Sequence, residues 1–228
     1  KVLRPLRSSF ERYGEVFVSL GVSFVPNFVS LYDEGVGDEG LYSELTPPKS
    51  SGERWIGVAP FAKHKGKIYP LDRMEKVVSK LSEESRVKIF LFGSGDRERE
   101  ILSLWRERYP GVISLADKRY GFAVELSLMS RLDVMISMDS ANMHLASLVE
   151  VPVVSVWGAT HPYCGFLGWR QSDSGVVELP LDCRPCSVFG NKPCYRKDYA
   201  CLEIAPETIV DRVKSLETLI CLLYTSDA

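Results

Sequence analysis

The segment 138–162 reads MDSANMHLASLVEVPVVSVWGATHP and carries the clearest structural signals in the chain. The apolar run Val134–Met138 leads into it and predicts a buried strand, because strands covered on both faces lose the usual polar alternation. An Asp-Ser-Ala turn at 139–141 then opens a short helix, and Val153–Trp157 predicts the next strand. Ligands of parallel sheets collect at the carboxyl ends of strands, where helix N-termini present free amides to anions. Two such ends lie close together here, so the segment predicts an anion-binding site.

The short helix after the turn has an apolar inward side, which consists of Met143, Leu145, Ala146 and Leu148. Asp139 can serve this helix as an ordinary N-cap, and His144 can be an ordinary core or surface histidine. The functional alternative is that both side chains face a ligand at the strand end. Motifs on either side of them favour that alternative.

Three motifs in residues 139–162 resemble those of glycosyltransferase family 9, the lipopolysaccharide heptosyltransferases. The second domain of that family carries Asp-Thr-Gly-x-x-His-Leu, then Val-Pro-Val, then Phe-Gly-x-Thr-x-Pro. The corresponding segments here are Asp139-Ser-Ala-Asn-Met-His144-Leu145, Val151-Pro-Val153 and Trp157-Gly-Ala-Thr160-His-Pro162. Ser for Thr and Ala for Gly keep the turn small enough for its amides to approach a phosphate. The resemblance implies that a nucleotide sugar is bound by Asp139, Ser140, Ala141, His144 and Thr160.

Composition sets outer bounds on the class of protein. With 228 residues, of which 45% are hydrophobic and 25% charged, the chain can bury a full core. The net charge of -2 and the pI near 6.0 argue against a nucleic-acid binder that works through a basic field. No apolar run approaches the roughly 18 to 20 residues of a membrane span, and no signal-peptide pattern opens the chain. We therefore expect a soluble, cytoplasmic protein.

The first part of the chain contains no strand with a glycine-rich turn. A helix is expected near its start, with one apolar side formed by Phe10, Tyr13, Val16, Phe17 and Leu20. Residues 21–54 are rich in Gly, Pro, Ser and acidic residues, which is typical of a linker. Members of the resembling family have an N-terminal Rossmann-like domain before this point. We therefore expect residues 1–54 to be the tail of a missing domain and a linker.

Residues 55–204 have the pattern of a compact α/β domain. Strands predicted at 55–59, 87–92, 112–115, 134–138 and 153–157 alternate with four helices. Short connections between such elements imply right-handed crossovers and a parallel sheet with helices on both faces. The predicted fold class is therefore Rossmann-like α/β. By resemblance it is the C-terminal, donor-binding domain of a GT-B glycosyltransferase.

The predicted helices each have an apolar side. Asp72 is expected to cap the first of them. The inward residues are expected to be Met74, Val77, Val78 and Leu81 in the first helix, Ile101, Leu102 and Trp105 in the second, and Phe122, Leu126 and Met129 in the third. Residues 205–220 predict a final bracing helix, with Pro206 in its first turn and Ile209, Val210, Val213 and Leu216 inward. Residues 221–228 continue no pattern and are expected to be a foreign tail.

The loop 60–67, PFAKHKGK, carries three lysines just after the first predicted strand. Loop lysines are usually solvated charges. Lys67-Ile-Tyr69-Pro70, however, resembles the family pattern in which a Lys precedes an aromatic-Pro pair. The resemblance implies that Lys67, assisted by Lys63, neutralises the diphosphate of the donor while the leaving group gains charge.

Gly93-Ser-Gly95 follows the second predicted strand. The third glycine of the dinucleotide fingerprint and its acidic partner are missing, so that fingerprint is weak. By resemblance the turn faces the ribose, with Glu98 at the position of a family Glu, although Arg97 is an equally near match. Tyr120 is implied to lie against the nucleotide base, where an aromatic ring can stack. The alternative for Tyr120 is an ordinary turn tyrosine.

The cysteines gather near the end of the compact region. A cluster of four suits tetrahedral zinc or disulfides, but only one Cys-x-x-Cys is present, so no zinc ribbon is matched. The expected state is reduced packing cysteines, and a structural metal clip is the alternative. The four residues are Cys183, Cys186, Cys194 and Cys201, while Cys164 and Cys221 stand apart.

The resemblance implies an inverting, metal-independent enzyme without a cofactor that transfers heptose from ADP-heptose to the lipopolysaccharide core. It would act in the cytoplasm, peripherally at the inner membrane. The catalytic base is expected in the missing domain, so this chain would bind a donor without transferring its sugar. Two alternatives stay open, a domain of another GT-B enzyme that uses a UDP-sugar and a non-catalytic module clipped by cysteines. The phosphate hypothesis requires Lys67 and Ser140 to converge at one rim of the sheet.

Overall fold

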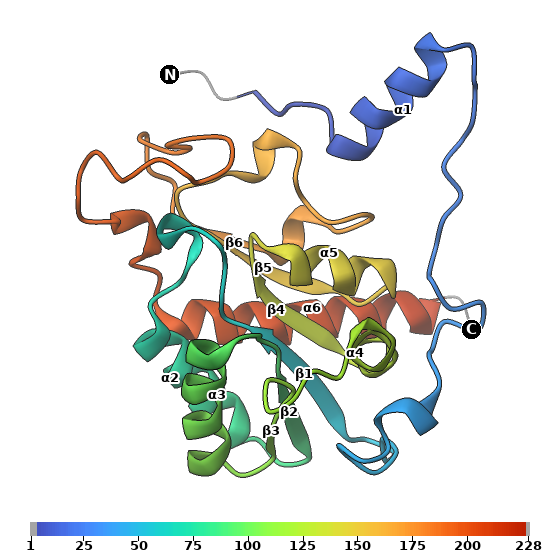
Figure 1. Ribbon diagram of the computed structural model, residues 1–228, viewed down its shortest axis with the longest axis vertical. Coiled ribbons are helices and arrows are strands. Elements are labelled where there is room, and N and C mark those ends of the chain that lie inside the picture. The colour runs from blue at the N-terminus through green and yellow to red at the C-terminus, as the bar shows by residue number, and fades with distance from the viewer. Residues whose placement is uncertain (1–3, 227–228) are drawn as a thin grey trace.

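The computed structural model describes residues 4–226, with side chains for residues 4–218, and its centre is a six-stranded parallel sheet (Figure 1). The strand order is β3-β2-β1-β4-β5-β6, and every neighbouring pair is parallel. The strands are β1 (Arg54–Ala59), β2 (Val87–Leu91), β3 (Val112–Ser114), β4 (Val134–Met138), β5 (Val153–Trp157) and β6 (Val176–Glu178). Five of them were predicted to within about one residue. The sixth was missed because three residues between loops are too short to make a pattern.

Helices cover both faces of the sheet, as expected for parallel strands. One face carries α2 (Leu71–Ser82), α3 (Asp96–Arg108) and α6 (Pro206–Ser226), and the other carries α4 (Phe122–Met129) and α5 (Ala141–Leu148) (Figure 1). The residues of β1 alternate between these layers. Ile56 and Val58 face α2 and α6, while Trp55 packs on the opposite side. The domain therefore has two apolar cores separated by the sheet.

The strand order reverses between β1 and β4. From β1 the chain proceeds through β2 to β3 at one edge, then returns to place β4 on the other side of β1. The loops after β1 and β4 consequently lead to opposite faces of the sheet and leave a crevice between them. Ligands of open α/β sheets bind at such a reversal. The lysine loop follows β1 and the Asp139 turn follows β4, so both reach this crevice.

Three details of the predicted helices were wrong. The residue at the N-cap of α2 is Pro70, so Asp72 lies within the first turn and does not cap it. Phe122 begins α4 and is 67% exposed, because the buried side of this helix starts at Ser127. In α5 the buried residues include Ser147, whose hydroxyl donates to the Met143 carbonyl, whereas Leu145 and Leu148 are only half-buried.

The helix α1 (Ser9–Ser19) lies away from the sheet at the N-terminal end (Figure 1). A capping box between Ser8 and Glu11 closes its first turn. It touches the domain through Phe10, whose ring meets that of Trp169 at 5.1 Å, and through Arg12, which donates to the Cys164 carbonyl. No residue of α1 is buried, and four of the five residues expected on its apolar side are exposed, namely Tyr13, Val16, Phe17 and Leu20. On that side Phe10 meets Trp169 and Phe17 meets the Phe24 ring at 5.7 Å, while Tyr13, Val16 and Leu20 remain largely exposed.

The final helix packs across β4, β5 and α2, and its backbone continues to Ser226. Its expected inward residues are all buried: Ile209, Val210, Val213 and Leu216. The foreign tail expected at 221–228 lies outside the residues whose side chains are described. Within the described residues, no helix combines the length and the apolar character that crossing a membrane requires.

Candidate functional site

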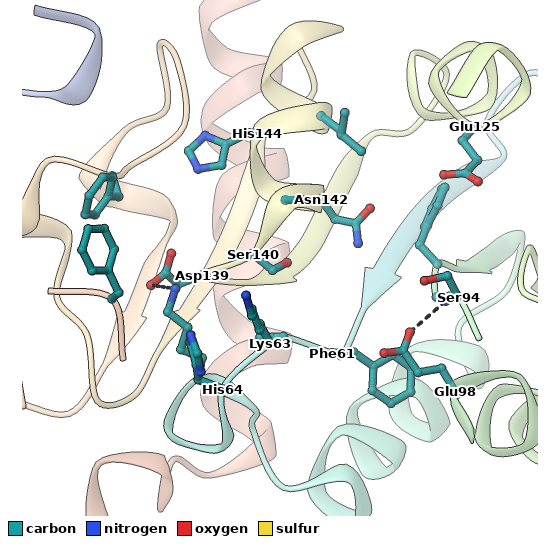
Figure 2. Close-up of a pocket in the computed structure, with 18 of the residues that line it drawn as sticks. Phe61, Lys63, His64, Ser94, Glu98, Glu125, Asp139, Ser140, Asn142 and His144 are labelled. Atoms are coloured by element: carbon teal, nitrogen blue, oxygen red, sulfur yellow. Dashed lines mark hydrogen bonds and ion pairs between the residues drawn. The ribbon is translucent and has the colours of Figure 1, made fainter. Parts of the chain in front are cut away.

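A cleft of about 750 Å³ opens at the carboxyl ends of β1, β2 and β4 (Figure 2). It therefore lies at the reversal of the strand order. Its polar wall is built from the loop after β1, the loop after β2, the helix α4 and the start of α5. The polar and charged residues that line it are Lys63, His64, Lys67, Ser94, Glu98, Glu125, Asp139, Ser140, Asn142 and His144.

Lys67 and Asp139 form an ion pair at one end of the cleft, with Nζ 2.8 Å from Oδ2. The Thr160 hydroxyl donates to the same carboxylate oxygen at 2.7 Å. Asp139 is only 5% exposed, so these two partners compensate a charge that has lost most of its water. Asp139 thus holds the Lys67 ammonium in place. Thr160 stands behind this pair and does not line the cleft.

Close backbone contact brings the lysine loop to the tip of β5. The Ala159 amide donates to the Gly66 carbonyl at 2.8 Å. A Cβ atom at Gly158 would lie 2.4 Å from that carbonyl oxygen, and one at Gly66 would lie 2.7 Å from the Ala159 methyl. Both positions therefore require glycine for the chains to approach this closely. The contact places Lys67 beside Asp139 and Thr160.

Arg184 supports this arrangement from below the cleft. Its guanidinium is 1% exposed and donates to the carbonyls of Gly158 and Thr160 and to the Glu178 carboxylate. It also donates to the Leu179 and Trp157 carbonyls. Five acceptors around one planar group fix the turn that presents Thr160. Sequence reasoning missed this residue, because the Cys-Arg-Pro-Cys segment was interpreted only through its cysteines.

The first turn of α5 faces the cleft with its amides uncapped. Ser140 occupies the N-cap position but makes no side-chain hydrogen bond to the helix, and its hydroxyl lies 3.3 Å from that of Ser137. Asp139 was expected as a possible N-cap, but its carboxylate pairs with Lys67 instead. Uncapped N-terminal amides and the helix dipole favour a bound anion. Lys63 projects toward Ser140 in the same space (Figure 2).

His144 lies one helical turn along α5 on the cleft wall (Figure 2). Burial lowers the pKa of this histidine, the negative charge of Asp139 opposes the shift, and the positive charge of Lys67 adds to it. At neutral pH the imidazole is therefore uncharged. A neutral imidazole still offers one N–H donor to an oxygen of a ligand.

Glu98 lies farther along the cleft and accepts a hydrogen bond from the Ser94 amide at 2.8 Å (Figure 2). Arg97, its neighbour in the sequence comparison, lines a separate pocket on the other side of the loop 61–63. Of the two residues, Glu98 therefore lines the cleft and Arg97 does not. Tyr120 does not line the cleft. Its partly buried ring packs against the core on the α4 and α5 side of the sheet, with the Lys118 ammonium 4.8 Å from its centre.

Two cleft residues that sequence reasoning did not single out are Phe122 and Glu125, both on α4. Phe122 presents its exposed ring to the cleft where Tyr120 was expected. Glu125 is half-buried, and burial alone raises the pKa of its carboxyl group. No sequence motif surrounds either residue. The burial of a charged side chain on a short helix becomes visible only in the folded structure.

Among the described side chains, Cys183, Cys194 and Cys201 are free thiols. Burial raises the pKa of Cys201 to about 11, which makes it a poor nucleophile at neutral pH. Across the described residues, no group of three or more His, Cys, Asp or Glu side chains is arranged to hold a metal ion. The loop that carries the cysteines instead covers the cleft with Val188 and Phe189.

The chain therefore folds as a Rossmann-like domain with a cleft at the reversal of its strand order, and lysines and the uncapped start of α5 line that cleft. Residues 38–194 match the model of "Glycosyltransferase family 9 (heptosyltransferase)". Because this match covers more than half of the chain, the chain belongs to glycosyltransferase family 9. The expected class, the C-terminal Rossmann-like domain of the GT-B type, is confirmed by the solved structures that it resembles.

A lipooligosaccharide heptosyltransferase 2 of Campylobacter jejuni is 25% identical over 172 residues, which are 74% of this chain and 53% of that protein. A family 9 glycosyl transferase from Veillonella parvula superimposes with a TM-score of 0.71 at 18% identity, over 96% of this chain and 62% of that one. An E. coli heptosyltransferase solved with ADP gives a TM-score of 0.65 at 16% identity, over 95% of this chain and 59% of that one. The chain thus spans about half the length of the curated relatives that it matches.

Proposed function

We propose that this chain is the donor-binding half of an inverting, metal-independent heptosyltransferase that uses ADP-heptose and extends a lipopolysaccharide or lipooligosaccharide core. The observation that supports this most directly is the convergence of Lys63, Lys67 and the uncapped start of α5 in one cleft. A similar E. coli structure contains ADP, which agrees with an adenine nucleotide as the donor carrier.

The diphosphate of the donor would lie at the end of the cleft lined by Lys63 and Ser140. The helix amides at Ser140 and Ala141 bind its oxygens, and Lys67, held by Asp139, neutralises the charge that develops as the sugar bond breaks. His144 contributes a neutral N–H donor. The protein's own cations and dipoles supply the stabilisation that a metal ion provides in other transferases.

The transfer also needs a base that removes the proton of the acceptor hydroxyl. The acidic residues lining this cleft are Glu98, Glu125 and Asp139. Asp139 is held by Lys67 and Thr160, and Glu98 is bonded to the Ser94 amide. Glu125 projects from α4 on the side of the cleft away from Asp139 and Ser140, where the diphosphate would lie. We place the base in the half of the enzyme that precedes this chain, and we place the whole enzyme in the cytoplasm at the inner membrane, where its acceptor lies.

Isothermal titration of the chain with ADP, UDP and GDP tests the proposal. ADP should bind, and UDP should bind about tenfold more weakly or worse. Equal or stronger binding of UDP would favour a GT-B enzyme that uses a UDP-sugar. Failure of every nucleoside diphosphate to bind would overturn the donor-site assignment. Sugar transfer by the isolated chain would contradict the placement of the base.

A further inference from the structure

Glu125 occupies the end of the cleft remote from the lysines. In Figure 2 it projects from α4 above Ser94, on the side away from Asp139 and His144. A smaller hollow of about 580 Å³ continues the cleft in this direction, toward the carboxyl end of β3. The two hollows share four lining residues, Gly93, Ser94, Phe122 and Glu125. Glu125 and Phe122 therefore stand at the junction of one continuous space.

The carboxyl group of Glu125 differs from the other acids of the cleft. Asp139 has Lys67 and Thr160 as partners, and Glu98 has the Ser94 amide. Within the described residues, no hydrogen bond or ion pair to the Glu125 carboxyl is formed, and burial is the one cause that shifts its pKa. Burying a charged group without a partner costs stability. Such a cost is typical of a group that is reserved for a ligand.

A nucleoside diphosphate fits this arrangement in one direction. With its diphosphate at Ser140 and the lysines, its ribose lies beside Glu98 and Ser94, and its base reaches Phe122 and Glu125. The exposed ring of Phe122 offers a face on which a base can stack. The carboxyl oxygens of Glu125 can accept hydrogen bonds, and the exocyclic amino group of adenine donates them. Uracil presents a carbonyl oxygen at each side of its single ring N–H, and these repel a carboxylate.

We propose that Glu125 selects the nucleobase by accepting a hydrogen bond from the exocyclic amino group of a base stacked on Phe122. This assignment rests on the proposed function of the cleft. It adds a specificity residue to that function, and it makes the 6-amino group of adenine the feature that is read. The phosphate end of the cleft then supplies affinity, and the α4 end supplies discrimination.

The test compares ADP with purine riboside 5′-diphosphate, which has a hydrogen atom in place of the amino group. The wild-type chain should bind ADP about tenfold more tightly, because losing a hydrogen bond to a half-buried charged group has that effect. Glu125→Ala should reduce ADP affinity to that of the analogue and leave the analogue unchanged. Glu125→Gln keeps a neutral acceptor and should retain part of the preference. Glu100→Ala, at an exposed position outside both hollows, is the control and should change neither affinity.

Thermal unfolding of the same variants separates selection from a structural role. Glu125→Gln should unfold at the wild-type temperature or higher, because it removes an unpartnered half-buried charge. A Glu125→Ala chain that still prefers ADP over the analogue would overturn this assignment and leave the proposed function standing. If the wild-type chain binds neither compound, the proposed function fails and the assignment fails with it.

Discussion

Lys67 and Asp139 are joined by a 2.8 Å ion pair that bridges the loop after β1 and the turn after β4. This pair crosses the reversal of the strand order, so it joins the two segments that form this end of the cleft. Neither residue can be replaced without affecting the other. Several measurable properties of the chain depend on this coupling.

Lys67→Met should destabilise the chain as well as weaken nucleotide binding. Of the two partners of the buried Asp139 carboxylate, the substitution removes Lys67 and leaves Thr160. Breaking an ion pair costs about 3 to 5 kcal/mol when both members are fully buried. Lys67 keeps some exposure, so we expect about 2 to 3 kcal/mol in urea unfolding. ADP affinity should fall at least about tenfold.

The double variant Lys67→Met with Asp139→Asn distinguishes the two effects. Removing both charges should recover most of the lost stability, because no buried charge remains unpaired. ADP affinity should stay low. Recovery of binding in the double variant would contradict a role for the Lys67 ammonium at the diphosphate. Lys65→Met is the control, since Lys65 lies over Tyr199 outside this cleft.

Ala141→Pro tests the amide at the start of α5 without changing a charge. Proline suits the first position of a helix, and Ser140 already has the extended backbone, with ψ 176°, that a residue before proline prefers. The variant should fold with nearly unchanged stability but bind inorganic pyrophosphate and ADP about tenfold more weakly, because one N–H donor is lost. Ala141→Ser keeps the amide and should bind as the wild type does. Undiminished pyrophosphate binding by Ala141→Pro would remove this amide from the site.

The lowered pKa of His144 predicts a pH dependence of stability. The ordinary value is 6.5, and burial lowers the pKa in the folded state. Between the folded pKa and 6.5 the unfolded chain binds more protons, so the free energy of unfolding should fall as the pH drops below about 6.5. His144→Asn should lack this part of the slope when urea unfolding is compared at about pH 7.5 and about pH 5.5.

A bound diphosphate should reverse the shift, because its negative charge favours the imidazolium. The pKa of His144, followed by NMR with and without ADP, should therefore rise on binding. ADP would then bind with proton uptake below pH 6.5. An unchanged titration curve in the presence of saturating ADP would place the diphosphate elsewhere.

Thr160→Val and Arg184→Met probe the support behind the ion pair. Thr160→Val removes the hydroxyl that donates to Asp139 and should cost about 1 to 2 kcal/mol with a several-fold loss of ADP affinity. Arg184→Met leaves the Gly158 and Thr160 carbonyls buried without this donor and should cost about 3 kcal/mol or more. Arg196→Met breaks an exposed pair with Asp198 and should leave the urea unfolding curve unchanged. Equal effects of the two arginine variants would contradict the clamp role of Arg184.

Sequence reasoning predicted the residues at the lysine end of the cleft better than those at the α4 end. At the lysine end Lys67, Asp139, Ser140, Ala141 and His144 all line the same cleft. They follow strands with strong apolar patterns, and parallel strands bring their carboxyl ends to one rim whatever the side chains are. At the α4 end Tyr120 packs against the core and Phe122 lines the cleft instead. At a helix start, side chains two residues apart point in different directions, and no periodic pattern in the sequence specifies which of them faces the cleft.

Local patterns alone were sufficient for the class of fold, the positions of five strands and the turn that opens α5, because each of these depends on hydrophobic period and turn chemistry over a few neighbouring residues. Contacts between distant segments were decided only by the folded chain: the Lys67–Asp139 pair, the Arg184 clamp and the unpartnered Glu125. The energies of these contacts depend on burial and on which side chains meet in the folded chain. Those quantities are properties of the packed molecule and leave no periodic trace in the order of its residues.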